Sequence, residues 1–165
     1  MSNRSFENIG KEELIRYLLE REGISEDELL SRFEKKSAES VPATIFATSL
    51  SPLESITRYL KENLGKKLVE ISRTLGKSPA ALSPAYKKAV TKKFEVRETE
   101  LLIPLSEFEQ NMDLSILEIA VNHLKNRGMR FTEIAALLEK DVRTVWTVYK
   151  RAEKKLSRKM KGGGR

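Results

Sequence analysis

The sequence predicts an all-α protein made of an N-terminal helical hairpin followed by two repeated three-helix modules. Three observations predict this fold. Apolar residues recur every three or four positions in most segments, which is the spacing of an amphipathic helix. Short stretches in the middle of the 165-residue chain recur in the same order near its end. Helix-capping residues and glycines separate the apolar segments, so each helix has a defined start and stop.

The first predicted element is the helical hairpin. Its helices are expected at 11–22 and 26–36, joined at Gly23, with Ser25 and Glu28 forming a capping box at the start of the second helix. The hairpin has too few apolar residues for its helices to bury one another completely. We therefore expect it to pack on one of the repeats or on a second copy of itself.

The repeat is visible in stretches that recur 62 to 64 residues apart. The paired stretches are 41–46 with 103–108, 50–54 with 114–118, 59–61 with 123–125, 70–71 with 133–134, and 86–89 with 149–152. So many pairs in one register predict two copies of one module. The expected segments are the hairpin at 1–40, the first repeat at 41–93, a linker at 94–102, the second repeat at 103–160 and a disordered tail at 161–165.

The second copy has the clearer helical pattern. Its first helix is expected at 114–126, where Gly128 ends the apolar spacing, and its second at 131–139, with Thr132 as the N-cap. Asp141 is expected to cap a longer third helix. The buried stripe predicted for that third helix is Val145, Val148, Tyr149, Ala152 and Leu156.

Residues 131–138 and 144–156 resemble the helix-turn-helix in region 4 of bacterial sigma factors, closest to the extracytoplasmic-function type and more distantly to LuxR-type regulators. Ala135 would let the two helices cross closely. The resemblance covers the second copy well and the first only partly, and no region that binds core polymerase is visible. It therefore implies tandem helix-turn-helix modules and DNA binding, but not a complete sigma factor. The turn departs from the usual pattern, because Glu139 and Lys140 stand where such motifs often have Gly and an apolar residue.

The resemblance implies that the third helix of the second copy enters the major groove of DNA. Arg143 is the main specificity candidate, because a guanidinium can donate two hydrogen bonds to guanine. The outward-facing residues expected at base edges are Arg143, Thr144, Trp146, Thr147 and Lys150. The residues expected to hold phosphates are Thr144, Lys150, Arg151 and Lys154, with Arg127 and Arg130 on the flanking backbone.

Five of these residues also have a structural interpretation. Arg143, Lys150 and Lys154 could belong to an ordinary solvated helix face. Arg151 could instead form a salt bridge with Glu133 that holds the two helices together. The single Trp, Trp146, could stack on a sugar or a thymine methyl group, or it could anchor the other repeat or a protein partner.

The first copy is expected to read bases poorly. Ala80 and Ala81 replace Arg143 and Thr144, and Pro84 stands where Thr147 stands, so we expect its third helix to break or kink there, with a restart at 83–84. Its remaining cations, Lys87, Lys88, Lys92 and Lys93, would still supply charge, so the first copy is expected to clamp the DNA backbone or to act as a scaffold. His123, at the place of Tyr59 in the first copy, is expected to be a packing residue rather than a metal ligand.

Composition narrows the possible functions. The net charge is +7, and segments 41–93 and 111–165 are basic whereas 1–40 and 94–110 are acidic. With no Cys and one His, thiol catalysis, disulfides, Cys-ligated zinc and His-centred chemistry are not expected, so we predict no enzyme, cofactor or metal. No stretch approaches the roughly 18 apolar residues of a membrane helix, and the start lacks a signal peptide, so a cytoplasmic protein is expected.

Three functions remain after these exclusions. The first is a DNA-binding transcriptional regulator that reads double-stranded DNA with the second repeat and clamps phosphates with the first. The alternative is a structural or adaptor protein whose sigma-like modules bind a protein partner. RNA binding is a weaker third hypothesis, because the sequence offers no aromatic stacking platform.

Overall fold

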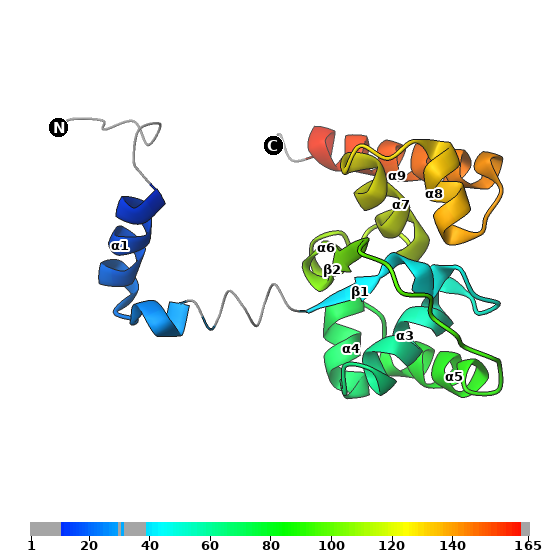
Figure 1. Ribbon diagram of the computed structural model, residues 1–165, viewed down its shortest axis with the longest axis horizontal. Helices are drawn as coiled ribbons and strands as arrows, with labels where there is room; N and C mark the ends of the chain where they lie inside the picture. Colours follow the sequence, from blue (N-terminus) through cyan, green and yellow to red (C-terminus); the bar gives the residue numbers. More distant parts are fainter. Residues whose placement is uncertain (1–10, 30, 32–38, 163–165) are drawn as a thin grey trace. The chain divides into compact units, whose positions relative to one another are not determined.

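A computed structural model of the chain describes residues 11–29, 31 and 39–162, which fall into two compact units, 1–39 and 40–165 (Figure 1). The described residues are mostly helical, which confirms the all-α class. One feature of the second unit was not predicted. Strands β1 (Ser40–Pro42) and β2 (Leu102–Pro104) form a short antiparallel ladder in which Val41 lies opposite Ile103.

The first unit begins with α1 (Lys11–Glu22), whose bounds are those predicted. The helix ends at Gly23, whose φ of 64° lies in the left-handed region that glycine adopts without steric cost. Helical backbone resumes at Glu26, and the Ser25 hydroxyl accepts a hydrogen bond from the Glu28 N–H at 3.2 Å. Most of the second predicted helix, residues 30 and 32–36, lies outside the described residues.

The second unit contains two runs of helices, one after each strand. The first run is η2 (Ala43–Phe46), α3 (Pro52–Glu62), α4 (Leu68–Leu75) and α5 (Pro79–Ala89). The second run is α6 (Leu105–Gln110), α7 (Ile116–Asn126), α8 (Phe131–Leu138) and α9 (Val142–Gly162). The short helices η2 and α6 were not predicted, and α9 extends into the segment expected to be a disordered tail.

The two runs pack together around one core. Helix α3 packs on α4 and α5, and α7 packs on α8 and α9. Each short opening helix joins the two runs, because η2 contacts both α3 and α8, and α6 contacts both α7 and α4. Helices α3 and α7 also touch each other, and α5 and α9 lie at opposite ends of this unit with α3 and α7 between them (Figure 1).

Capping boxes define the starts of α3 and α7. The Ser51 hydroxyl accepts from the Glu54 N–H at 3.3 Å and Glu54 Oε2 accepts from the Ser51 N–H at 3.1 Å; Ser115 and Glu118 make the same pair of bonds in α7. Helix α7 therefore begins at Ile116, two residues later than predicted.

The N-cap predicted for α8 is wrong. Arg130 is the N-cap, and Thr132 lies inside the first turn. The reason is that Glu133, at the third helical position, supplies the acceptor: its Oε2 accepts a hydrogen bond from the Arg130 N–H at 2.7 Å. The carboxylate satisfies an N–H at the helix start without a short polar side chain at the cap.

The packing of α8 on α9 agrees with the sequence interpretation. Ala135 is buried at the crossing, and Ile134, Leu138, Val145 and Val148 of the same two helices are buried as well. On α9, Ala152 is buried and both Tyr149 and Leu156 pack against the core with part of their surface exposed. The predicted inward stripe of α9 is thus confirmed.

The turn between α8 and α9 tolerates its unusual residues by placing Glu139 in the left-handed region, with a φ of 51°. The Lys140 N–H donates to the Ala135 carbonyl at 2.9 Å, which closes the end of α8. Gly76 has a similar conformation at the end of α4, with a φ of 64°. The two turns therefore share one backbone conformation, with glycine at one position and a strained glutamate at the other.

The break predicted at Pro84 does not occur, since α5 runs without interruption from Pro79 to Ala89. A proline in a helix removes one N–H donor, which leaves the carbonyl four residues earlier, that of Ala80, without its usual partner. Both Ala80 and Pro84 are exposed, so water can satisfy that carbonyl.

Candidate nucleic-acid interface

Helix α9 carries a row of cations on the side opposite its buried stripe. Because a helix turns by about 100° per residue, Val145, Val148 and Ala152 face the core together, and residues roughly half a turn away face solvent. We call the exposed cations of this outer side the basic stripe. Its members are Arg143, Lys150, Arg151, Lys154, Arg158 and Lys161, all exposed.

The stripe begins at a well-capped helix start. Asp141 Oδ1 accepts a hydrogen bond from the Arg143 N–H at 2.7 Å, as expected of a residue that caps α9. One turn later the Thr147 hydroxyl donates to the Arg143 carbonyl at 2.9 Å. These bonds use the backbone of Arg143, and its guanidinium forms no ion pair with any residue that the structure describes.

The remaining cations of α9 are held by acidic residues. Lys155 binds the buried carboxylate of Glu118, at 2.9 Å from Oε2 and 3.2 Å from Oε1. Lys159 lies 3.5 Å from Asp113. Within the stripe, Lys150 pairs with Glu153 at 3.0 Å, and the other five cations make no ion pair among the described residues. Helix α9 thus directs its structural cations to one side and its unpaired cations to the other.

Trp146 flanks the stripe. Its side chain is 49% exposed, and the Lys150 ammonium lies 5.9 Å from the centroid of its ring. Val142, one turn earlier on the same side of α9, is also exposed. Trp146 therefore offers an aromatic face to a partner directly beside the basic stripe.

The two arginines predicted to grip the flanking backbone lie near the start of α8. Arg127 donates from Nη1 to the Leu102 carbonyl at 3.4 Å, and the 80% exposed Arg130 pairs with Glu133 at 3.3 Å. The backbone hydrogen bond from Arg130, with the nearby cations, lowers the pKa of Glu133. The alternative salt bridge from Arg151 to Glu133 is not among the contacts of the described residues.

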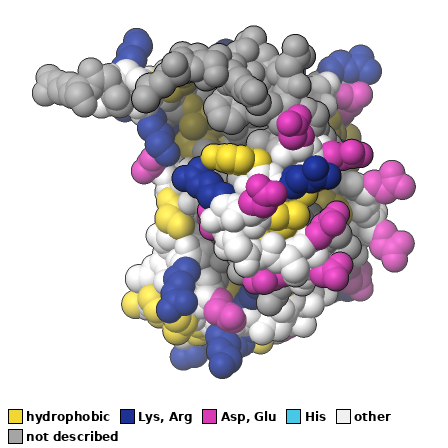
Figure 2. Space-filling model, turned by 90° about the vertical axis from the view of Figure 1, so that its left-hand side faces the viewer, with side chains coloured by type: hydrophobic (Ala, Val, Ile, Leu, Met, Phe, Trp, Pro, Cys, Tyr) yellow, Lys and Arg dark blue, Asp and Glu magenta, His cyan; other side chains and the backbone are white. Residues whose placement is uncertain are grey.

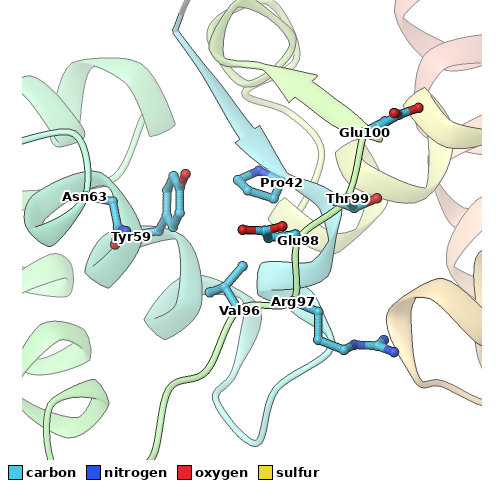
Figure 3. Close-up of a pocket in the computed structure, with 8 residues that line it drawn as sticks. All are labelled: Pro42, Tyr59, Asn63, Val96, Arg97, Glu98, Thr99 and Glu100. Atoms are coloured by element: carbon cyan, nitrogen blue, oxygen red, sulfur yellow. The ribbon is translucent and has the colours of Figure 1, made fainter.

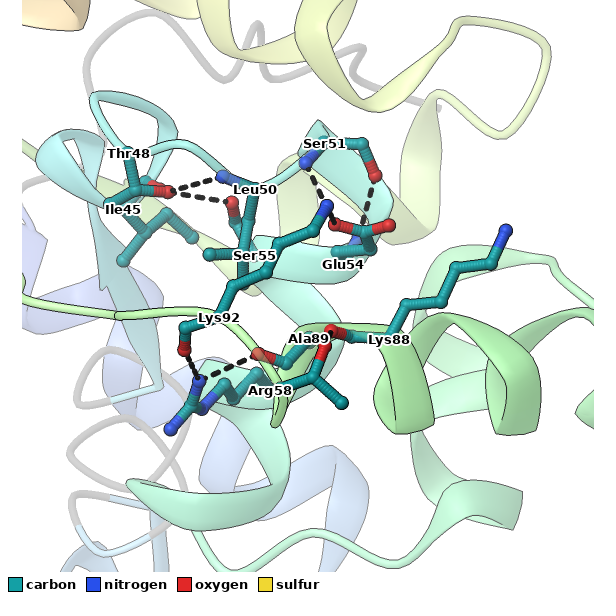
Figure 4. Close-up of polar contacts among 11 residues, drawn as sticks. Ile45, Thr48, Leu50, Ser51, Glu54, Ser55, Arg58, Lys88, Ala89 and Lys92 are labelled. Atoms are coloured by element: carbon teal, nitrogen blue, oxygen red, sulfur yellow. Dashed lines mark hydrogen bonds and ion pairs between the residues drawn. The ribbon is translucent and has the colours of Figure 1, made fainter.

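In the first run of helices, Lys92 and Arg58 hold the fold together instead of facing solvent unpaired. The Lys92 ammonium binds the buried Glu54 at 2.8 Å, and Arg58 Nη1 donates to the carbonyls of Ala89 at 2.8 Å and Lys92 at 2.9 Å, which completes the end of α5 (Figure 4). The hydrogen bond from Lys92 is the main cause of the lowered pKa of Glu54. Lys88 points away from this network and is exposed.

Helix α5 lacks an equivalent of the basic stripe at its start. Ala80, Ala81 and Pro84 are exposed at the positions where α9 has Arg143, Thr144 and Thr147. The predicted phosphate contacts, Lys87 and Lys88, are both exposed in the last turn of α5. The structure therefore separates the eleven predicted residues into a group of nine around α8 and α9 and a pair on α5.

Acidic surface lies elsewhere. An open pocket of about 580 Å³ lies between α3 and the segment before β2, and its charged lining consists of Glu98, Glu100 and Arg97 (Figure 3). Its carboxylates would repel phosphates. Asp and Glu side chains are also prominent on the face in Figure 2, interspersed with Lys and Arg. The described residues contain no group of three or more His, Asp or Glu side chains that could hold a metal ion.

Sequence reasoning missed two cations of the stripe, Arg158 and Lys161. The signal was present, because Arg158 and Lys161 continue the spacing of Arg151 and Lys154 along one side of a helix. It was overlooked because Lys161 was assigned to a disordered tail, whereas α9 continues to Gly162.

The candidate site is thus a helix surface rather than a cavity. None of the helices in the described part of the chain has the length and apolar character needed to cross a membrane. Comparison with known proteins finds no matching family model, no similar curated protein and no similar solved structure.

Proposed function

We propose that this chain is a DNA-binding protein, a transcriptional regulator that reads the major groove of duplex DNA with α8 and α9. The observation that carries this proposal is the basic stripe, whose cations are exposed and mostly without ion-pair partners on the outer side of α9. The major groove of B-DNA admits one α-helix, and phosphates attract a row of unpaired cations.

The recurrence of contacts supports the interpretation that the second unit consists of two copies of a helix-turn-helix module. The pairs α3–α5 and α7–α9 match, as do α4–α5 and α8–α9. A side-chain contact recurs as well, because Lys92 binds the capping-box residue Glu54 as Lys155 binds Glu118. Each opening helix would bridge the two copies, because η2 contacts α3 and α8 while α6 contacts α7 and α4.

The two copies have different roles in this proposal. The second copy reads bases with Arg143 and Thr147, while Lys150, Arg151 and Lys154 hold phosphates. The first copy contributes charge through Lys87 and Lys88 but has no side chain able to donate to a base edge at Ala80 or Ala81. Only one copy would therefore determine the sequence preference.

A protein-binding adaptor is the second candidate function. It is favoured by Trp146 and Val142, two exposed apolar side chains one turn apart on α9. In that case Trp146 would anchor a protein partner, and the basic stripe would surround this anchor.

Binding of fluorescently labelled duplex DNA, followed by anisotropy between about 50 and 200 mM salt, tests the proposal. We expect a complex at low salt whose affinity falls steeply with salt, and tighter binding to a duplex obtained by selection than to random sequence. Absence of a complex with any duplex at low salt would reject DNA binding in favour of the adaptor.

The fluorescence of Trp146 supplies a second signal in the same titration, because Trp146 is the only Trp of the chain. Its fluorescence and its quenching by acrylamide should both change when duplex binds beside Lys150. A complex that leaves the Trp146 signal unchanged would place the DNA on another surface.

A further inference from the structure

Helix α9 is longer than its packing requires. Leu156 is the last residue of the helix that packs against the core, and every residue from 157 to 162 is exposed. Helix α5, which makes matching contacts in the first run, ends at Ala89 and has no such extension. The last turns of α9 therefore contribute nothing to the buried core of this unit.

The cations of this extension are sorted by side. Arg158 and Lys161 continue the basic stripe and form no ion pair among the described residues, whereas Lys159 faces Asp113 at 3.5 Å. Interaction with the helix dipole favours cations near any helix C-terminus, but that effect does not depend on which side of the helix they occupy. The dipole alone thus leaves the placement of Arg158 and Lys161 unexplained.

Helix geometry decides what the extension can reach. Arg143 and Lys161 are separated by about 27 Å along the helix axis at about 1.5 Å per residue, and a straight helix whose first turns contact base edges cannot follow the groove over that length, because the groove curves around the duplex. When the first turns of α9 lie at base edges, its last turns have already left the groove. Their side chains then face the phosphates that border it.

We infer that the extension of α9 is a phosphate-binding arm in which Arg158 and Lys161 hold the DNA backbone beyond the groove read by Arg143. The inference rests on the proposed function and deepens it, since it assigns a separate partner group to residues outside the helix-turn-helix. The arm adds affinity for every duplex alike and carries no sequence preference, because phosphates are the same at each base pair.

The test compares two double variants of the full chain that lose the same charge. The first, Arg158→Gln with Lys161→Gln, removes both cations of the arm. The control, Arg97→Gln with Lys159→Gln, removes two exposed cations that are paired with Glu139 and Asp113. Circular dichroism establishes that both variants keep the helical content of the parent. Affinities for random and selected duplexes are then measured across the same salt series.

The arm variant should lower the slope of log affinity against log salt by about 1.8, at roughly 0.9 per lost phosphate contact. The control should lower it by less than half as much, and neither variant should change the ratio of selected to random affinity. Equal losses in both variants would mean that net charge alone matters, and a changed ratio would mean that the extension reads bases; either result overturns the inference. If the parent binds no duplex, or binds only RNA, the proposed function has failed rather than the arm.

Discussion

Arg143 lies near the start of α9 and Ala80 near the start of α5, and under the proposed function this difference predicts that α9 rather than α5 reads bases. Arg143→Ala should reduce the preference for a selected site by roughly 1–3 kcal/mol, because a bidentate contact to guanine is lost. Binding to random duplex should change little. The measurement is the ratio of the two affinities at one salt concentration.

The matched change in the first copy is Lys87→Ala with Lys88→Ala. These residues are exposed in the last turn of α5 and are expected to meet only phosphates, so their loss should weaken binding to every duplex and lower the salt slope. The opposite pattern, in which the lysine pair relaxes specificity and Arg143 does not, would make α5 the reader.

The left-handed conformation of Glu139 predicts that replacing this residue with glycine stabilises the protein. An L-residue in the left-handed region costs roughly 1–2 kcal/mol, so Glu139→Gly should stabilise the protein by about 0.5–1 kcal/mol after the greater freedom of glycine in the unfolded chain is subtracted. The exposed ion pair that Arg97 forms with Glu139 at 3.5 Å contributes little. Urea unfolding measures the difference.

Gly76→Ala is the reverse experiment. A Cβ at Gly76 would meet Met112 Sδ at 2.7 Å and would also occupy the left-handed region, so this variant should be less stable than the parent. A destabilised Glu139→Gly together with an unaffected Gly76→Ala would show that the turn conformations have been misassigned.

The Glu54–Lys92 pair predicts that part of the folding stability depends on pH. Its pKa is lowered in the folded state from the value of 4.5 expected for a free side chain, chiefly by the hydrogen bond from Lys92. A lowered pKa means that the ionised carboxylate stabilises the fold above about pH 4.5, and that this contribution is lost as the pH falls through the folded value. The stability advantage of the parent over Glu54→Gln, measured by urea unfolding, should therefore shrink between pH 6 and pH 3, within the range where free carboxyl groups titrate at about 4.

Glu95→Gln is the control for that series, because Glu95 is 75% exposed in its pair with Lys93. Its difference from the parent should stay small at each pH. A difference between the parent and Glu54→Gln that stays constant across the series would contradict the role assigned to the Glu54–Lys92 pair.

At the scale of residues, the sequence predicted a role correctly where a single local interaction determines it. Asp141 caps α9 because a carboxylate before a helix accepts from its first N–H groups. The N-cap predicted at Thr132 was wrong because Glu133 accepts the hydrogen bond at the start of α8. The sequence pattern does not show which of two neighbouring acceptors a helix start uses. The ion pairs of Lys92 and Lys155 were missed because each joins residues that lie far apart in the sequence.

At the scale of elements, the apolar spacing predicted α1, α7, α8 and α9 to within a few residues. It missed the ladder of β1 and β2, because three-residue strands are too short to show alternation. Pro84 misled the prediction for α5, since an exposed proline removes a hydrogen bond that water replaces.

The two recurring stretches, Val41-Pro42 and Ile103-Pro104, predicted a repeat, and they also lie in the two strands. Val41 and Ile103 are themselves the paired residues at the centre of the ladder. In both stretches the proline is followed directly by a short helix, η2 or α6. The contacts of these helices with α8 and α4 could not be foreseen, because they join segments distant in sequence.

For the whole molecule, the N-terminal unit should be dispensable for DNA contact. Residues 1–40 carry more Asp and Glu than Lys and Arg, and the second unit has its own core. Deletion of residues 1–39 should therefore leave the salt slope nearly unchanged while lowering thermal stability or changing the oligomeric state measured by sedimentation. A large loss of slope in a deletion that remains folded would mean that the DNA surface includes the first unit.

Amide chemical shifts of the isotope-labelled full chain, recorded during titration with duplex DNA, test the central claim most directly because they locate the bound surface residue by residue. The account predicts that the largest changes fall on the start and outer side of α9, at Arg143, Thr147, Lys150 and Arg151, and extend toward Lys161. Changes concentrated on the exposed start of α5 or on α1, or a spectrum that does not respond to any duplex at low salt, would contradict it.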